Sequence, residues 1–393
     1  MTPLLGPLTR RFAALFIVML PQCSPAENAA TSDAGQASQA DSSSEPEEAL
    51  QKPAAGDRDG AVAAVRKAFA AMQAGRLEEA AQLATAAVDL DPALVDARVL
   101  RSQILSMPGK QFNPLVGLRD VRIAALVEPE NPAVVAAQGL LRYQLGQTER
   151  ARGFLEAFLA MPPPPGSEQS RAQAHESLGV IDLDARHLDE ADRHFAAAQA
   201  LANVRSSAYY RSRVAAERGD LEGEMRWLDE SLKLDPHYLP ARNKRALLLA
   251  KLGRSAEASV ERELQEVLRK LADDVSASFA NDHAGKAALW GRVAELLPRD
   301  GLSRVNRLHE LYLASDYEKV LDEGEQIVAQ GGGVPRVLGD IARAAAQLGN
   351  QDKAVATLQQ LGSAQPAARP EAIAAIRKEV DEILASKKRG GNP

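Results

Sequence analysis

Gly75-Arg76-Leu77-Glu78-Glu79-Ala80 is the stretch that decides the fold, because close copies of it recur along the chain. The clearest copies share a turn residue and an alanine five positions later, and they occupy residues 146–151, 186–191, 253–258 and 349–354. Two weaker copies occupy residues 219–224 and 315–320. The turn residues at 186, 219, 253, 316 and 349 are 33, 34, 63 and 33 residues apart. A repeated unit with a period of about 34 residues, interrupted once, therefore organises the chain.

Each copy has the pattern of two helices joined by a tight turn. Apolar residues recur at intervals of three and four on both sides of the turn, with charged residues on the other face. Glycine is the usual turn residue because the C′ residue of a reversing helix commonly takes a positive φ, which strains any residue with a Cβ atom. Between the pairs, Asp91-Pro92, Asn131-Pro132 and Asp235-Pro236 predict a capping side chain and a proline in the first turn of the next helix.

This pattern resembles the tetratricopeptide repeat family, whose units are pairs of antiparallel helices. Three units match the family best, at the small or bulky residues where the two helices cross, at the turn and at the join to the next unit. The matching residues are Ala68, Gly75, Ala80, Ala84, Ala87 and Pro92 in the first of these units, Gly139, Gly146, Ala151, Leu155, Phe158 and Pro163 in the second, and Gly179, Arg186, Ala191, Phe195 and Ala198 in the third. The resemblance runs from about Asp59 to Lys387. It implies an all-α fold, a right-handed superhelical solenoid of about 7–8 helix-turn-helix repeats with a C-terminal capping helix.

Composition along the chain predicts five segments. They are an export signal at 1–23, a disordered linker at 24–58, a main repeat array at 59–280, degenerate and C-terminal repeats at 281–369, and a capping helix with a short tail at 370–393. Within the main array, an insertion at 107–113 and a proline-rich join at 162–166 are expected to form exposed loops.

Two helices at the C-terminal side depart from the regular unit. Residues 255–280 contain no glycine or proline, so a helix of about 39 Å is expected there at the α-helical rise. The segment 267–300 fits either a degenerate repeat or a hinge. An amphipathic capping helix is predicted by the apolar stripe Ile373, Ile376, Val380, Ile383 and Leu384.

The N-terminal segment has the proportions of an export signal. Arg10-Arg11 precedes an apolar run at 12–20, which is shorter than the roughly 20 residues that a membrane-spanning helix needs. Leu20-Pro21-Gln22-Cys23 resembles a bacterial lipoprotein box, which implies acylation of the Cys23 thiol, although Gln22 departs from the small residue usual there. Ordinary cleavage after Ala26, or a retained start, stays open. Residues 24–56 are poor in bulky apolar side chains, which is typical of a tether.

Composition and motifs narrow the classes of function. The formal net charge of −6 and the absence of a basic segment give no reason to expect a nucleic acid as partner. His175-Glu176 and His309-Glu310 lack the second histidine of a zinc protease motif, and no phosphate-binding glycine loop or nucleophile elbow is present. No cofactor, metal or catalytic residue is therefore predicted.

One cluster of histidines and carboxylates is a candidate metal site. His187 and His194 lie near Asp184, Asp189 and Asp192 around an expected turn. Solvated side chains are the favoured interpretation and metal binding is the alternative.

The resemblance also implies a ligand surface. First helices of tetratricopeptide units line the inner groove, and the register assigns to it Tyr209, Tyr210 and Arg213 of one unit and Asn243 and Lys244 of the next. Arginine, asparagine and lysine bind carboxylates or backbone carbonyls, and tyrosine adds contact area at a small entropy cost. A groove that is merely solvated stays the alternative.

The expected function is therefore a non-enzymatic protein–protein interaction scaffold of the bacterial cell envelope, binding a partner peptide or helix in the groove. Its expected location is the periplasm, anchored to a membrane through lipid on Cys23. The alternative is an accessory subunit of an envelope enzyme or of a polysaccharide-export complex.

Overall fold

The computed structural model describes residues 50–202, 204–272, 281–364 and 369–390, and these residues form only α-helices and their connections. Cys23 and the predicted export signal lie outside them. The described part divides between Asp235 and Pro236 into two units, which are treated separately. That division falls inside the range 59–280, which is predicted from the sequence to be one repeat array.

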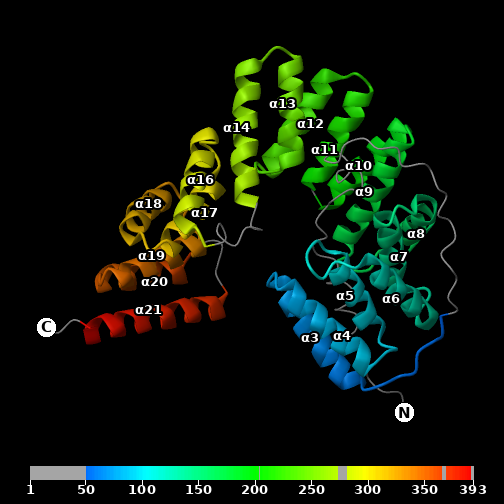
Figure 1. Ribbon diagram of the computed structural model, residues 1–393, viewed down its shortest axis with the longest axis horizontal. Coiled ribbons are helices and arrows are strands. Elements are labelled where there is room, and N and C mark those ends of the chain that lie inside the picture. Colours follow the sequence, from blue (N-terminus) through cyan, green and yellow to red (C-terminus); the bar gives the residue numbers. More distant parts are fainter. Residues whose placement is uncertain (1–49, 203, 273–280, 365–368, 391–393) are drawn as a thin grey trace. The chain divides into compact units, whose positions relative to one another are not determined.

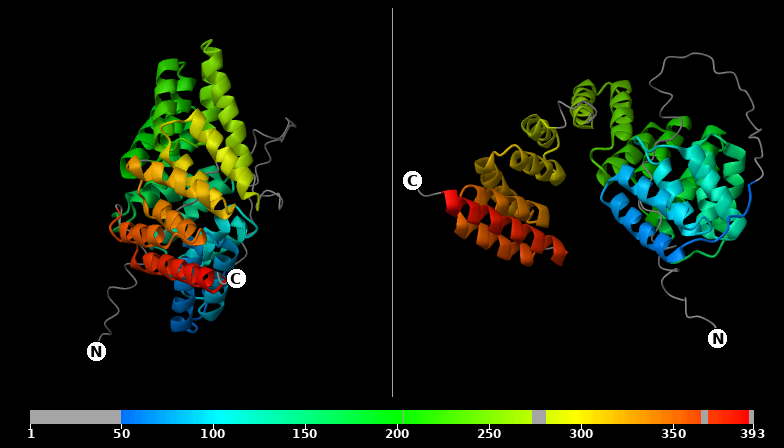
Figure 2. Two further views of the ribbon diagram at one scale, coloured as in Figure 1. Left: turned by 90° about the vertical axis from the view of Figure 1, so that its left-hand side faces the viewer. Right: turned by 60° about the horizontal axis from the view of Figure 1, so that its bottom comes forward.

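Ten helices belong to the first unit as described (Figure 1). They are α3 (Arg58–Gln73), α4 (Leu77–Leu90), α5 (Val95–Ser106), α6 (Pro114–Val127), α7 (Pro132–Gln144), α8 (Thr148–Ala160), α9 (Glu168–Asp184), α10 (Leu188–Ala202), α11 (Arg205–Glu217) and α12 (Leu221–Leu234). Consecutive helices pack as five pairs, α3/α4 to α11/α12, and the views of Figure 2 show the same pairing.

Eight described helices belong to the second unit. They are α13 (Leu239–Lys251), α14 (Ser255–Ala272), α16 (His283–Leu296), α17 (Gly301–Leu313), α18 (Tyr317–Ala329), α19 (Pro335–Gln347), α20 (Gln351–Gly362) and α21 (Pro370–Gly390). The eighteen described helices slightly exceed what 7–8 pairs and a cap require. Helix α14 ends at Ala272, so the continuation expected to residue 280 falls on residues that are not described.

The turns within the pairs have the geometry that the sequence predicts. Gly75, Gly146, Gly219, Gly253 and Gly349 all have φ between 74° and 75°. At each of them, the N–H of the next residue donates to a carbonyl five positions earlier, as in Arg76 to Ala71 at 3.0 Å. These bonds satisfy carbonyls that a helix end leaves without partners. Arg186 and Ser315 occupy the same position with φ of 63° and 62°, so the backbone geometry is kept where glycine is missing. The turn residue of the copy at 315–320 is therefore Ser315, one position before the residue 316 that the spacing predicted.

The joins between pairs differ in part from the prediction. Asn131 caps α7 as expected, accepting from the Ala133 N–H at 2.9 Å with Pro132 in the first turn. The capping roles expected of Asp91 and Asp235 are wrong, because α5 begins only at Val95 and α13 only at Leu239. Asp91 instead accepts from Ala93 within the intervening turn and from Gly56, and it thereby holds the segment that leads into α3.

Small residues set the approach of the helices within a pair. The alanine that follows each turn is fully buried at positions 80, 151, 191, 258 and 354. A Cβ atom added to Gly179 would lie 2.6 Å from Cε1 of Phe195, and one added to Gly139 would lie 2.8 Å from Leu155. The large side chain of the second helix therefore occupies the space above a glycine of the first.

Buried clusters of charged side chains link the two helices in two of the pairs. In α5/α6, Asp120 accepts from Arg98 Nη1 at 2.9 Å and from Arg101 Nε and Nη2, each at 2.6 Å. In α13/α14, Glu261 accepts from Arg242 Nη1 at 2.8 Å and also from Arg245. Each cluster joins two arginines of a first helix to one carboxylate of the second.

The last helix covers the end of the second unit. Val380 of α21 is fully buried, and Ile373, Ile376, Ile383 and Leu384 pack around it against the α19/α20 core. No helix in the described ranges combines the length and the apolar content that crossing a bilayer requires.

Candidate functional site

First helices form a continuous layer in the first unit. Helices α3, α5, α7, α9 and α11 each contact the next one of the series, and no comparable contact joins the second helices of these described pairs. An array whose first helices touch while its second helices stay apart is curved toward the first helices. The hollow side of this unit is therefore lined by α3, α5, α7, α9 and α11.

The predicted tyrosine pair divides between core and surface. Tyr210 of α11 is 3% exposed, and its ring stacks on Phe195 of α10 at 5.2 Å between centroids and 13° between planes. The prediction that Tyr210 offers its ring to a ligand is therefore wrong, because the ring is part of the core. Tyr209 is only half-buried, with its ring 5.4 Å from that of Tyr210.

Arg213 lies one turn after Tyr209 on α11, and two residues of α7 and α9 belong to the same region. The guanidinium carbon of half-buried Arg213 is 5.8 Å from the centre of the Tyr210 ring. Tyr143 of α7 packs at the edge of the same apolar cluster as Tyr209. At the end of α9, partial desolvation raises the pKa of the Asp184 carboxyl, and the nearby charge of Arg213 acts in the opposite direction. Tyr143, Asp184, Tyr209 and Arg213 are called the α7–α9–α11 patch below.

The other two predicted groove residues lie in the second unit. Asn243 of α13 is exposed and Lys244 is half-buried, whereas Arg242 and Arg245 beside them turn inward to Glu261. The structure thus places Tyr209 with Arg213 and Asn243 with Lys244, as two surfaces on separate units.

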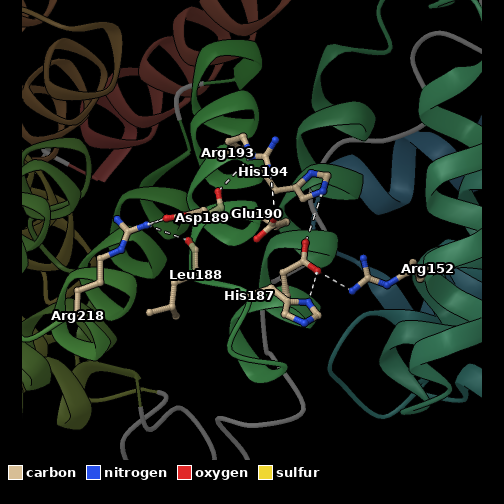
Figure 3. A network of polar contacts seen from close by, with 9 residues as sticks. Arg152, His187, Leu188, Asp189, Glu190, Arg193, His194 and Arg218 are labelled. Atoms are coloured by element: carbon tan, nitrogen blue, oxygen red, sulfur yellow. Dashed lines mark hydrogen bonds and ion pairs between the residues drawn. The ribbon is translucent and has the colours of Figure 1, made fainter.

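A polar network connects α8, α9 and α10 (Figure 3). The carboxylate of Asp182 is almost fully buried, and Arg152 Nη2 donates to it at 2.6 Å. His194 Nε2 and His187 Nδ1 lie 3.6 and 3.8 Å from the same carboxylate. His175 Nδ1 lies 3.0 Å from His194 Nδ1, so one of these rings donates to the other.

Burial governs the protonation of this network. It lowers the pKa of His175 to about 4, with the charges of His194 and Arg171 acting in the same direction. It also lowers the pKa of His194, although the carboxylate of Asp182 opposes that shift. A hydrogen bond between the two Nδ1 atoms requires at least one neutral ring, which agrees with both directions.

The network differs from the histidine cluster considered from the sequence. Asp189 and Asp192 pair instead with Arg218 and Arg211 of the α11/α12 pair. Asp182 was missed, although a carboxylate between Ile181 and Leu183 in an apolar helix was the available signal. Within the described residues, no group of three or more histidine, cysteine or acidic side chains is arranged to hold a metal ion.

Comparisons with known proteins concern the fold. No protein-family model matches the chain, and no curated protein matches it. Among solved structures, PilW, a widely conserved type IV pilus biogenesis factor, is 15% identical, with a TM-score of 0.45 over 52% of this chain and 92% of that one. PilF of Pseudomonas aeruginosa is 15% identical, with a TM-score of 0.43 over 62% and 95%. YrrB, described as a TPR protein with an unusual peptide-binding site, is 18% identical, with a TM-score of 0.35 over 46% and 89%.

The helix pairs themselves have tetratricopeptide architecture. A period of about 34 residues, a turn residue at positive φ and a small residue under the large side chain of the second helix occur together in successive pairs. The described helix pairs therefore form an all-α repeat fold of the tetratricopeptide type.

Proposed function

We propose that this chain is a non-enzymatic scaffold of the bacterial cell envelope that holds a partner protein by a peptide or helix laid across the α7–α9–α11 patch. The observation that carries the proposal is that half-buried Tyr143, Tyr209 and Arg213 and the exposed Asp184 come from α7, α9 and α11, the helices that line the hollow side of this unit, and that the charge of Arg213 acts on Asp184. Stacked pairs keep such a surface preformed, so a ligand does not have to order it on binding.

The residues of the patch favour a particular partner chemistry. Arg213 can bind a carboxylate through two parallel N–H bonds, and the tyrosine rings can cover an apolar or aromatic side chain. Asp184 can accept from a backbone N–H or a hydroxyl of the ligand. A segment with an acidic residue close to an apolar one therefore fits better than a basic segment, which Arg213 would repel.

Envelope placement rests on the N-terminal sequence. Arg10-Arg11, the apolar run at 12–20 and Cys23 fit export followed by acylation. A lipid on Cys23 would hold the scaffold near one membrane, where a tether raises its effective concentration toward partners in the same compartment.

The binding proposal is tested by crosslinking in the native cell. A photoreactive amino acid at Tyr209 should capture a partner, and Arg213→Glu in the same chain should abolish that capture by reversing the charge. Arg193→Glu is the matched control, because Arg193 lies on the second helix α10 and has exposed contacts there with Glu190 and with the carbonyl of Asp189. Asn243→Ala with Lys244→Glu tests whether the surface of the second unit takes part. Capture that survives Arg213→Glu, in a chain of unchanged circular dichroism, contradicts the proposal.

The lipid anchor has an independent test. Radiolabelled fatty acid should enter the wild-type chain and leave Cys23→Ser unlabelled. Mass spectrometry of the mature N-terminus distinguishes acylation from cleavage after Ala26, and a chain that begins at Glu27 without lipid would replace the anchored form by simple export.

A further inference from the structure

An apolar and basic stripe runs along the solvent side of α6. Leu115 is 61% exposed and Phe112, in the insertion that precedes the helix, is 48% exposed; Val116 and Leu126 are also exposed. Leu115, Arg119, Arg122 and Leu126 follow each other at spacings of four, three and four, which places them on one face. These four residues, with Phe112 and Val116, are called the α6 stripe below.

The six residues of the α6 stripe include two arginines and no acidic residue. Arg119 is exposed and Arg122 half-buried, and the one acidic residue of α6, Asp120, is buried under Arg98 and Arg101. Lys110 in the insertion adds a cation; its Nζ lies 3.3 Å from Glu78, but its side chain is 87% exposed.

The other second helices of this unit differ from α6 in charge. Helices α4, α8, α10 and α12 all have acidic residues in the first turn, which complement the helix dipole, whereas α6 has none. In its place α6 begins with Pro114-Leu115-Val116. Helix α6 therefore differs from the other second helices in two ways: it exposes apolar side chains, and its first turn lacks acidic residues.

We propose that the α6 stripe is a membrane-contact surface that binds anionic lipid headgroups. Phe112 and Leu115 enter the boundary between headgroups and acyl chains, while Arg119, Arg122 and Lys110 stay at the level of the phosphates. Apolar side chains flanked by cations on one helix face are the arrangement by which helices lie in a membrane interface.

Charge favours this occupant over a second copy of the chain. A symmetric dimer through the stripe would bring Arg119 and Arg122 of both copies into one interface, and like charges in an apolar contact are repelled. Charge also disfavours a basic segment. The contact requires no lipid on Cys23, so it is separate from the anchor considered above, and it also leaves the α7–α9–α11 patch free for a protein.

The decisive experiment places a probe in the stripe. Cys23→Ser removes the chain's single cysteine, and Leu115→Cys then accepts an environment-sensitive fluorophore. Vesicles of phosphatidylglycerol and phosphatidylethanolamine should shift its emission to the blue, with a smaller shift in high salt and little shift on phosphatidylcholine alone. Leu302→Cys on α17 is the matched control, because Leu302 is 51% exposed and should not enter the lipid. No shift at position 115, or equal shifts at both positions, overturns the proposal.

A second measurement uses no probe. Phe112→Ser with Leu115→Ser should weaken co-sedimentation with the anionic vesicles at least about tenfold, because two exposed side chains lose their apolar burial. The N-terminal segment is the same in all chains and cancels from the comparison. Unchanged sedimentation of this variant contradicts the proposal, as does self-association through the stripe in analytical ultracentrifugation or selective crosslinking of position 115 to a protein.

Discussion

Asp120→Asn should destabilise the first unit by about 3–5 kcal/mol, because it removes the one charge that balances two buried arginines. The side chains of Arg98 and Arg101 are 8% and 15% exposed, so neither guanidinium can replace Asp120 by water without rearrangement. Burial lowers the pKa of Arg98, and the charge of Asp120 is the main influence that opposes this. Asparagine keeps the shape of the side chain but turns an N–H₂ group toward guanidinium donors.

Urea denaturation followed by far-ultraviolet circular dichroism measures this effect. Glu79→Gln is the matched control, because Glu79 pairs with Arg76 at 3.0 Å on the surface of α4 and both side chains are at least half exposed. Loss of this surface ion pair should lower the free energy of unfolding by less than about 1 kcal/mol. Hydrogen exchange should locate the effect of Asp120→Asn, with amide protection falling in α5 and α6 and being kept in α13 and α14.

Replacing the whole cluster separates charge balance from packing. Arg98→Met, Arg101→Leu and Asp120→Leu in one chain remove all three charges and keep apolar volume, so stability should recover to within about 2 kcal/mol of the wild type. The reasoning is refuted if Asp120→Asn is as mild as Glu79→Gln, or if the triple replacement is more damaging than Asp120→Asn alone.

Three further perturbations test the helix crossing, the turn and the histidine network. Gly179→Ala should cost about 1–3 kcal/mol in urea denaturation, because its Cβ would lie 2.6 Å from Phe195, whereas Gly153→Ala on α8 points into open space and should stabilise by about 0.5–1 kcal/mol. Ser315→Gly should raise the thermal midpoint by relieving a positive φ of 62°, a gain of up to about 1 kcal/mol. Burial lowers the pKa of His175 from 6.5 to about 4, so the contribution of the neutral ring to stability is complete above pH 6.5 and is lost as the pH falls toward 4. The urea midpoint of His175→Gln should therefore fall less over that pH range than the midpoint of the wild type.

The repeat pattern predicted the helices and their turns because both depend on local chemistry. Glycine at C′ and the buried alanine after it are fixed by the backbone of one pair and by its crossing. Arg186 was placed at a turn by its position in a copy of the motif and by its spacing, although it is not a glycine, and the structure gives it a left-handed φ of 63°. The motif and its period together therefore located a turn that the turn residue's own type did not indicate.

Exposure on the first helices was harder to predict, because it depends on the neighbouring pair. The register assigns Tyr209 and Tyr210 to the same face, yet only Tyr209 keeps an accessible edge. Phe195, which stacks on Tyr210, lies on the second helix of the preceding pair. Contact between successive first helices reduces the part of each helix surface that solvent can reach. A single sequence does not show how closely two neighbouring pairs approach each other.

The arginines at the joins explain why some polar residues of the core were missed. Arg98 donates to the carbonyl of Pro92 at 2.7 Å, and Arg242 donates to that of Pro236 at 2.9 Å; both prolines follow the end of a helix. Carbonyls near helix ends lack N–H partners from the next turn, and an arginine six residues later reaches back to one of them. Its guanidinium is then buried, which requires a carboxylate on the second helix.

The same spacing occurs a third time, in Pro298 and Arg304, where the bond is 2.9 Å. Here the carboxylate Glu323 pairs with Arg307 at 2.7 Å and is 27% exposed, compared with 2% for Asp120. A proline followed by arginines six and nine residues later thus predicts an acidic partner on the next helix, as in all three pairs. Because these charges satisfy one another inside a pair, they are explained by folding. This sets them apart from Arg213 of the α7–α9–α11 patch, which is half-buried on a first helix of the first unit.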